Sequence, residues 1–222
     1  MSDIAFRGRV GPQNAGDGSD PVVRQGSTGE LIVQDLNGRF YEQAVRGNVF
    51  IYNSVATGIA LIVSATTGGH PTIFNPLGSG KNWIPIALYL GYVSGNNAPG
   101  SLALALTESA GAAPATGAPI LTGTHVAPVS ALLGSGSASV MKWYPTTNTF
   151  TAAPTVVLST GISLFTGVAA TAVAPFTLIV PFDGSIILPP GNSLSLVSLQ
   201  ATTTALFVTS WLAVEATEPE LS

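Results

Sequence analysis

Glycine and proline interrupt this sequence too often for a long helix to form. The 222 residues include 25 glycines and 16 prolines, and both residue types disfavour helix interiors. Even the alanine-rich run from Ala110 to Pro119 contains Gly111, Pro114 and Gly117. Between the interruptions lie short apolar runs, which are typical of strands bounded by turns. The sequence therefore predicts an all-β protein.

The strand pattern is clearest at residues 101–107, where Leu102, Leu104 and Leu106 alternate with Ala103 and Ala105. Alternation with a period of two is the signature of a strand with two different faces. The expected strands are 49–52, 58–64, 72–74, 83–93, 101–107, 140–144, 155–165, 176–181, 185–188, 193–199 and 205–214. So many short strands form a sandwich or a barrel, and their number behind an extended arm favours a jelly-roll-like β-sandwich.

Three parts follow from the composition along the chain. Residues 1–46 form an extended N-terminal arm, in which a short β-hairpin is expected: a strand at Glu30–Leu36, a turn at Asn37-Gly38 and a return through Arg39, Phe40 and Tyr41. Asn-Gly is a strong hairpin signal. Residues 47–216 form the jelly-roll-like domain, and residues 217–222 form an acidic tail.

Charge is scarce and unevenly distributed. Only 8% of the residues are charged, against about 25% in an ordinary globular protein. Residues 1–46 hold 11 of the 18 charged residues, and residues 47–214 hold only Lys81, Glu108, Lys142 and Asp183. The net charge of −4 argues against nucleic acid as a partner, because phosphate binding needs clustered Lys and Arg. Two interpretations of the uncharged body remain: a surface coated with hydroxyl groups, or a subunit that is buried in an assembly.

No membrane span and no thiol chemistry are expected. Residues 143–182 lack charge, but Pro145, Pro154, Pro175 and Pro181 interrupt them, whereas a spanning helix needs about 20 mostly apolar residues. The chain has no cysteine, which excludes disulfides and cysteine-based zinc sites.

Motifs for catalysis or cofactor binding are incomplete. Pro76-Leu77-Gly78-Ser79-Gly80-Lys81 resembles the end of a phosphate-binding loop, but Asn75 and Asn82 stand where that motif needs Gly and Ser or Thr. No Gly-x-Ser-x-Gly motif accompanies the two histidines, His70 and His125.

The carboxylates of the body, Glu108, Asp183 and Glu215, occupy a strand end, a turn and the start of the tail. We therefore expect no enzymatic activity, no cofactor and no metal.

The aromatic residues allow two interpretations. Trp83, Trp211 and the pair Trp143-Tyr144 can form a platform that stacks on sugar rings. Inside β-sandwiches, however, such residues more often anchor the core or an interface. We favour the core.

Three segments carry a resemblance to a known class of proteins. They are Glu30–Ala44 with Arg46–Phe50, then Phe74–Asn82, and then Phe182–Leu194, which contains Phe182-Asp183-Gly184-Ser185 and Leu188-Pro189-Pro190-Gly191-Asn192. Together they resemble virion structural proteins of tailed bacteriophages, of the jelly-roll capsid decoration or cement kind. The resemblance spans roughly residues 30–215, and its motifs are structural.

The resemblance implies a non-enzymatic protein on the outside of the phage head, commonly a homotrimer, that binds itself and the major capsid protein and stabilises the shell. The arm residues expected to contact neighbours are Arg39, Phe40, Tyr41, Arg46 and Phe50. Two alternatives remain open. One is a tail, fibre or spike component that binds the host. The other is a carbohydrate-binding module with Trp143 and Tyr144 as its platform.

Overall fold

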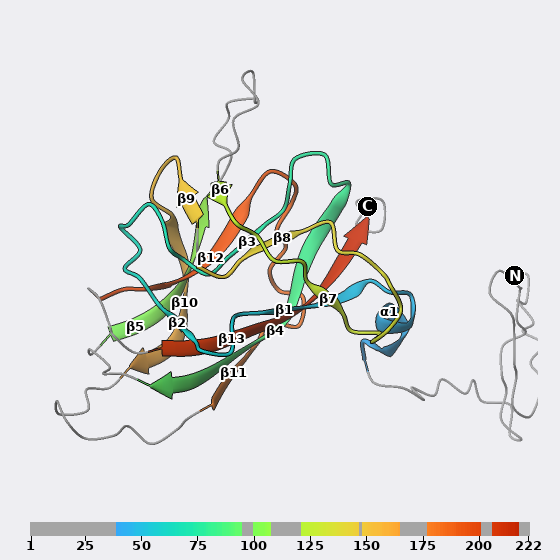
Figure 1. Cartoon of the computed structure of the whole chain (residues 1–222), viewed down its shortest axis with the longest axis horizontal. Coiled ribbons are helices and arrows are strands. Elements are labelled where there is room, and N and C mark those ends of the chain that lie inside the picture. Colours follow the sequence, from blue (N-terminus) through green and yellow to red (C-terminus); the bar gives the residue numbers. More distant parts are fainter. Residues whose placement is uncertain are drawn as a thin grey trace, which may run out of the picture. The chain divides into compact units, whose positions relative to one another are not determined.

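The computed structural model describes residues 39–94, 100–107, 121–146, 148–164, 177–200 and 206–217, and all structural statements below concern these residues (Figure 1). They form antiparallel strands and one short helix, so the all-β prediction is confirmed. In chain order the elements are α1 (Tyr41–Val45), β1 (Val49–Asn53), β2 (Ile59–Ala60), β3 (Thr72–Phe74), β4 (Lys81–Ser94), β5 (Gly100–Thr107), β6 (Leu121–Gly123), β7 (Val129–Ser130), β8 (Lys142–Tyr144), β9 (Asn148–Phe150), β10 (Thr155–Leu164), β11 (Thr177–Pro181), β12 (Ser193–Ser198) and β13 (Leu206–Thr217).

Two sheets pack against each other to form a sandwich. The first has the strand order β11-β4-β13-β1-β7, with β2 added to the free part of β13. The second has the order β10-β5-β12-β3-β8. A small separate pair, β6-β9, completes the β structure of the described residues.

Strand pairing is nested around the middle of the chain. Strand β1 pairs with β13, β3 with β12, β4 with β11, and β5 with β10, all antiparallel. Along the chain β1, β3, β4 and β5 alternate between the two sheets, and so do β10, β11, β12 and β13. Most partners lie far apart in the sequence. The short strands β6 to β9 are inserted between β5 and β10.

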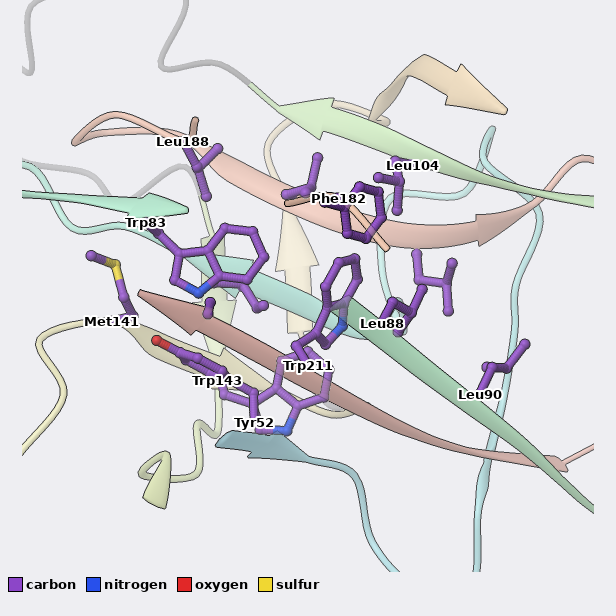
Figure 2. Close-up of a cluster of buried hydrophobic side chains, with 14 of the residues drawn as sticks. Tyr52, Trp83, Leu88, Leu90, Leu104, Met141, Trp143, Phe182, Leu188 and Trp211 are labelled. Atoms are coloured by element: carbon purple, nitrogen blue, oxygen red, sulfur yellow. The ribbon is translucent and has the colours of Figure 1, made fainter. Parts of the chain in front are cut away.

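The core between the sheets is built around three tryptophans (Figure 2). Trp83, Trp143 and Trp211 are each 0–1% exposed. Trp83 meets Trp211 edge-on with ring centroids 5.5 Å apart, and Tyr52 meets Trp83 in the same way at 6.0 Å. Phe182 stacks on Trp211 at 5.8 Å. Edge-to-face and offset contacts are the favourable aromatic geometries, so the interpretation of the tryptophans as core residues is confirmed.

The predicted alternation in β5 is also confirmed, because the leucines and alanines occupy different environments. Leu102 and Leu104 belong to the central core. Ala103 and Ala105 form a separate buried cluster with Val197 of β12, on the other face of the second sheet. That face also carries a cluster of Phe74, Leu121, Tyr144 and Phe150, in which residues of β6 and β9 cover β3 and β8.

The returning strand of the predicted hairpin is wrong, because Tyr41–Val45 is a helix. The helix ends at Val45 and is followed by Gly47, whose φ of +74° is a conformation that favours glycine. The Gly47 N–H donates to the Ala44 carbonyl at 3.0 Å, and the Asn48 N–H donates to the Gln43 carbonyl at 2.9 Å. These two bonds form a Schellman motif. The predicted turn, Asn37-Gly38, lies outside the described residues, and the helix stop at Gly47 was not predicted. The first hairpin strand, Glu30–Leu36, lies outside the described residues.

Residues 185–188 were also predicted wrongly. They form no strand, and Leu188 makes only an isolated bridge to Trp83. Asp183 and Gly184 have positive φ values of 49° and 82°, and the Ser185 N–H donates to the Phe182 carbonyl at 2.9 Å. The chain therefore turns here before β12. Strands β6, β7 and β9 were not predicted, because each has only two or three residues.

Replacement of Gly47 tests the helix stop. A Cβ atom at Gly47 would lie 2.5 Å from Ser137 Oγ, whereas one at Gly80, whose φ is +66°, would meet nothing within 4 Å. Both Gly→Ala changes carry the left-handed conformational cost of about 1–2 kcal/mol. We expect Gly47→Ala to lower the free energy of unfolding by more than Gly80→Ala, as measured by denaturant titration. Equal losses would mean that Ser137 gives way freely.

Candidate functional site

The outer face of the first sheet is the part of the described surface that is best suited to contact another protein. Its residues follow from the register: Ile179 lies opposite Tyr89, which lies opposite Ser210, and Val129 lies opposite Ile51, which lies opposite Leu212. On β13 and β4, the residues that precede and follow them in the sequence point into the core. Because successive side chains of a strand alternate between its two faces, these side chains lie on the outside. Tyr89 is 39% exposed, Val129 54% and Ile179 55%. We call these six residues, with Val208, the outer face.

Charge is absent from this face. The strands of the first sheet contain two charged residues, Lys81 and Glu215, and these interact with each other at one end of the β4–β13 pair. Ordinary solvent-facing strands alternate apolar residues with polar ones. Here the side that should face water carries valine, isoleucine, leucine and tyrosine, and hydroxyl groups cover only part of it.

A second apolar area adjoins the edge of the same sheet. It consists of Val45 at the end of α1 and of Leu132, Leu133 and Val140 in the segment between β7 and β8. These side chains are 37–76% exposed, and Leu133 is the most exposed. The segment is attached to the sheet through the Ala131 N–H, which donates to the Val49 carbonyl at 2.8 Å. We call these four residues the edge patch.

A buried carboxylate fixes the segment that carries the edge patch. Glu215 of β13 is 1% exposed. Its Oε1 accepts hydrogen bonds from Tyr52 Oη, at 2.9 Å, and from Ser139 Oγ. Its Oε2 accepts the Val140 N–H at 3.1 Å, and Lys81 Nζ lies 3.9 Å away. Three donors and a cation thus compensate for the loss of water around the charge, as burial of an ion requires.

Tyr52 is the residue of this cluster whose pKa is shifted. Burial raises the pKa of the Tyr52 hydroxyl well above 10, and the negative charge of Glu215 raises it further. The phenol therefore stays protonated and remains a hydrogen-bond donor to the carboxylate. Such a group is a poor general base at neutral pH, so the cluster is suited to holding the chain together.

A second buried polar cluster lies on the outer side of the second sheet. Asn148 Oδ1 accepts the N–H groups of Gly69 and His70 at 2.8 and 3.2 Å. Asn148 Nδ2 donates to the His70 carbonyl and to Thr72 Oγ1, and Thr72 Oγ1 lies 2.8 Å from Ser195 Oγ. The bonds join β9, the segment before β3, and β12, so this cluster is a structural junction.

His70 is neutral within that junction. Burial lowers the pKa of its imidazole, and the hydrogen bond to the Thr66 carbonyl, at 2.8 Å from Nε2, opposes this only in part. Nδ1 has no hydrogen-bond partner among the described residues. A proton on Nδ1 would leave a buried charge without compensation.

The five predicted contact residues differ in their exposure to solvent. Arg39, Tyr41 and Arg46 are exposed and Phe40 is half-buried, with the Arg39 guanidinium 5.4 Å from the Phe40 ring centroid. Phe50 differs, because it is 1% exposed and belongs to the core. It alternates with Val49 and Ile51 in β1, and the register with Ala213 turns it inward. Phe50 is therefore not available to a partner.

The proposed sugar platform is wrong, because Trp143 and Tyr144 are 1% and 4% exposed. Trp143 Nε1 donates to the Asn53 carbonyl at 2.7 Å within the sandwich. His125, the second histidine, lies exposed against the Tyr144 ring at 5.8 Å.

The remaining candidates for chemistry do not converge on one site. Lys81 of the incomplete phosphate-loop motif approaches Glu215, and Asp183 occupies the turn before β12. Glu108 lies outside the described residues. Among the described residues there is no group of three or more His, Asp or Glu that could hold a metal ion.

Sequence reasoning missed the role of Glu215, which we placed at the start of the tail. Strand β13 continues to Thr217, and a β-bulge between Leu212 and Ala213 changes which side chains face inward. The available signal was the position of Glu215 directly after an apolar strand in a region that is almost free of charge.

Comparison with protein-family models, with curated proteins and with solved structures finds no match in any of the three. In the part of the chain that the structure describes, no helix has the length and hydropathy of a membrane-spanning helix.

Replacement of Glu215 tests the buried carboxylate. We expect Glu215→Ala to lower the free energy of unfolding by about 3–5 kcal/mol, because it leaves three donors and Lys81 without their acceptor. Lys81→Met is the matched control. It should cost less than about 1 kcal/mol, since Lys81 is partly exposed and its Nζ–carboxylate distance is long. Denaturant titration measures both values, and a larger loss for Lys81→Met would contradict this assignment of roles.

His70 should make stability depend on pH. Because burial lowers its pKa in the folded state, the unfolded chain takes up a proton first as the pH falls below about 6.5. Above that pH His70 is neutral in both the folded and the unfolded state. Below it the free energy of unfolding decreases as the pH falls. We expect the loss of melting temperature between pH 7 and pH 5 to be smaller in His70→Gln. His125→Gln is the control, because it removes the other histidine, which is exposed; an equal reduction in both variants would contradict the role of His70.

Proposed function

We propose that the sandwich is a jelly roll. Eight strands carry the two sheets, and we number them first to eighth in chain order: β1, β3, β4, β5, β10, β11, β12 and β13. They pair as first with eighth, second with seventh, third with sixth, and fourth with fifth. The two sheets therefore have the orders 1-8-3-6 and 2-7-4-5. A long hairpin folded over on itself gives this arrangement, which is that of the double-sheet jelly roll with two Greek keys.

We further propose that the chain is a non-enzymatic structural protein of a tailed-phage virion that decorates or cements the head. The observation that supports this most is the outer face, where apolar side chains are exposed on a sheet without charge on that side. Exposed apolar surface of this kind marks contacts between proteins. In this proposal the outer face joins copies of the chain, as a homotrimer. The resemblance of three sequence segments to decoration proteins is the reason for assigning this assembly to a phage head.

The charged residues around α1 have a separate role in the proposal. Arg39 and Arg46 are exposed charged residues, and Tyr41 is exposed as well; charged groups at the rim of an interface govern specificity and register. We assign them, with Phe40, to contact with the major capsid protein on the outside of the head. The proposal includes neither nucleic acid nor membrane as a partner.

A change on the outer face tests self-association. We expect light scattering of the purified full-length chain to give a multiple of its 22.5 kDa mass. Tyr89→Lys should lower that mass, because it places a charge in the apolar contact. Val55→Lys is the matched control: Val55 is 49% exposed and lies outside the sheet strands. A monomer for the unchanged chain at all concentrations would overturn the assembly proposal.

Contact with the capsid is tested separately, by co-sedimentation with heads that lack the protein. A double charge reversal, Arg39→Glu with Arg46→Glu, should weaken sedimentation with the heads and leave the mass in solution unchanged. Unchanged sedimentation would remove these arginines from the capsid contact.

A further inference from the structure

The four edges of the two sheets are not equally protected against pairing with another chain. An edge strand presents unpaired backbone N–H and C=O groups, and proteins protect such edges by shortness, charge, proline, β-bulges or coverage. Strand β7 has two residues. Strand β8 has three, includes Lys142, and is bridged by the Val126 N–H, which donates to the Trp143 carbonyl at 2.7 Å. Strand β11 has five residues and ends in Pro181.

Strand β10 is the least protected of the four edges, because it is long and has neither a charge nor a proline. It has ten residues without a charge or a proline, and among the described strands it pairs only with β5. Val156, Val157 and Leu158 are 40%, 52% and 42% exposed. Val156 is paired with Ala105 and Leu158 with Leu104, and Ala105 and Leu104 lie on opposite faces of the sheet, so exposed side chains of β10 are found on both faces. The register of β10 with β5 shifts between Val156 and Leu158 and again between Ser159 and Ser163, and these irregularities are the one protection of this edge among the described residues.

We propose that β10 is a docking edge that pairs antiparallel with β10 of a second copy. The partner must supply an extended strand with a free edge and no charge opposite Val156, Val157 and Leu158. Among the described strands, β10 itself meets these conditions best. Antiparallel pairing about a two-fold axis places like residues opposite each other near the axis. Val156–Leu158 suits this, because apolar and β-branched cross-strand pairs stabilise a sheet whereas like charges oppose pairing.

The consequence is a continuous sheet of ten strands across two copies, formed by the second sheet of each. The inference rests on the proposed self-association but uses a different surface, since β10 belongs to the second sheet and the outer face to the first. A two-fold contact of this kind can link two assemblies that are formed through the outer face.

Cysteine cross-linking of the full-length chain tests the pairing, because the chain has no cysteine of its own. Directly opposed residues in antiparallel strands have Cα atoms about 4.5–5.5 Å apart, which is within the range for a disulfide. Val156→Cys, Val157→Cys and Leu158→Cys are oxidised in turn. We expect at least one to form covalent dimer about a hundredfold faster than Val55→Cys, because pairing raises the effective concentration. Cross-linking no faster than that of Val55→Cys in all three would overturn the proposal.

A charge at the same edge gives an independent readout. We expect Val157→Lys to halve the mass in solution while the far-ultraviolet circular dichroism and melting temperature stay unchanged, and Ile187→Lys, at a site 47% exposed outside the strands, to leave the mass unchanged. An oligomer that keeps its mass in Val157→Lys would overturn the β10 contact and leave the outer face in place. A monomeric unchanged chain would overturn both proposals.

The N-terminal segment of another copy is the competing occupant of this edge. Mixing full-length Val157→Cys with full-length Val33→Cys distinguishes it, since Val33 lies in the middle of the strand predicted at Glu30–Leu36. Preferential cross-linking between the two variants, identified by peptide mass, would assign the edge to that segment and overturn β10 self-pairing.

Discussion

Strands β4 and β13 lie side by side over twelve register partners, from Lys81 with Thr217 to Leu206 with Ser94. Trp83 and Trp211 extend from this pair into the core, and Tyr52 and Phe182 pack on them. Strand β13 also pairs with β1 and β2, and β4 pairs with β11. The whole first sheet therefore depends on a contact between two segments that are far apart in the sequence. Such contacts are slow to form in general, because they require the closure of a long loop.

The sequence allowed the fold class and most of the long strands to be predicted. Strand β3 was predicted with its observed bounds, and β5 and β12 within one residue, because turn-forming residues flank them and apolar residues alternate within them. The helix α1 was missed, since a five-residue helix is too short to show periodicity and is fixed by the Gly47 stop. The assignment of residues 185–188 failed because Asp183-Gly184 turns the chain and only Leu188 reaches a partner.

The candidate site was harder to predict than the fold. Scarcity of charge was visible in the sequence, but which sheet face carries exposed apolar residues depends on register and on the bulge in β13. Phe50 illustrates the difficulty. Val49, Phe50 and Ile51 are all apolar, so only pairing with Ala213 decides which of them faces the core. Glu215 illustrates it further, because a carboxylate beside the tail is buried only through donors from β1 and from the segment before β8.

The pairing of β1 with β13 has a consequence for how the body is connected to the rest of the chain. Val49 and Val214 are register partners, so the body is entered and left at neighbouring points. Of the 18 charged residues, 13 lie before Gly47 or after Thr217, the last residue of β13, and are thus attached near that single place. The same adjacency means that the ends of the body could be joined by a short linker and the chain opened at an exposed turn elsewhere. Every strand pairing would survive in such a circular permutant, because none of them depends on where the chain begins.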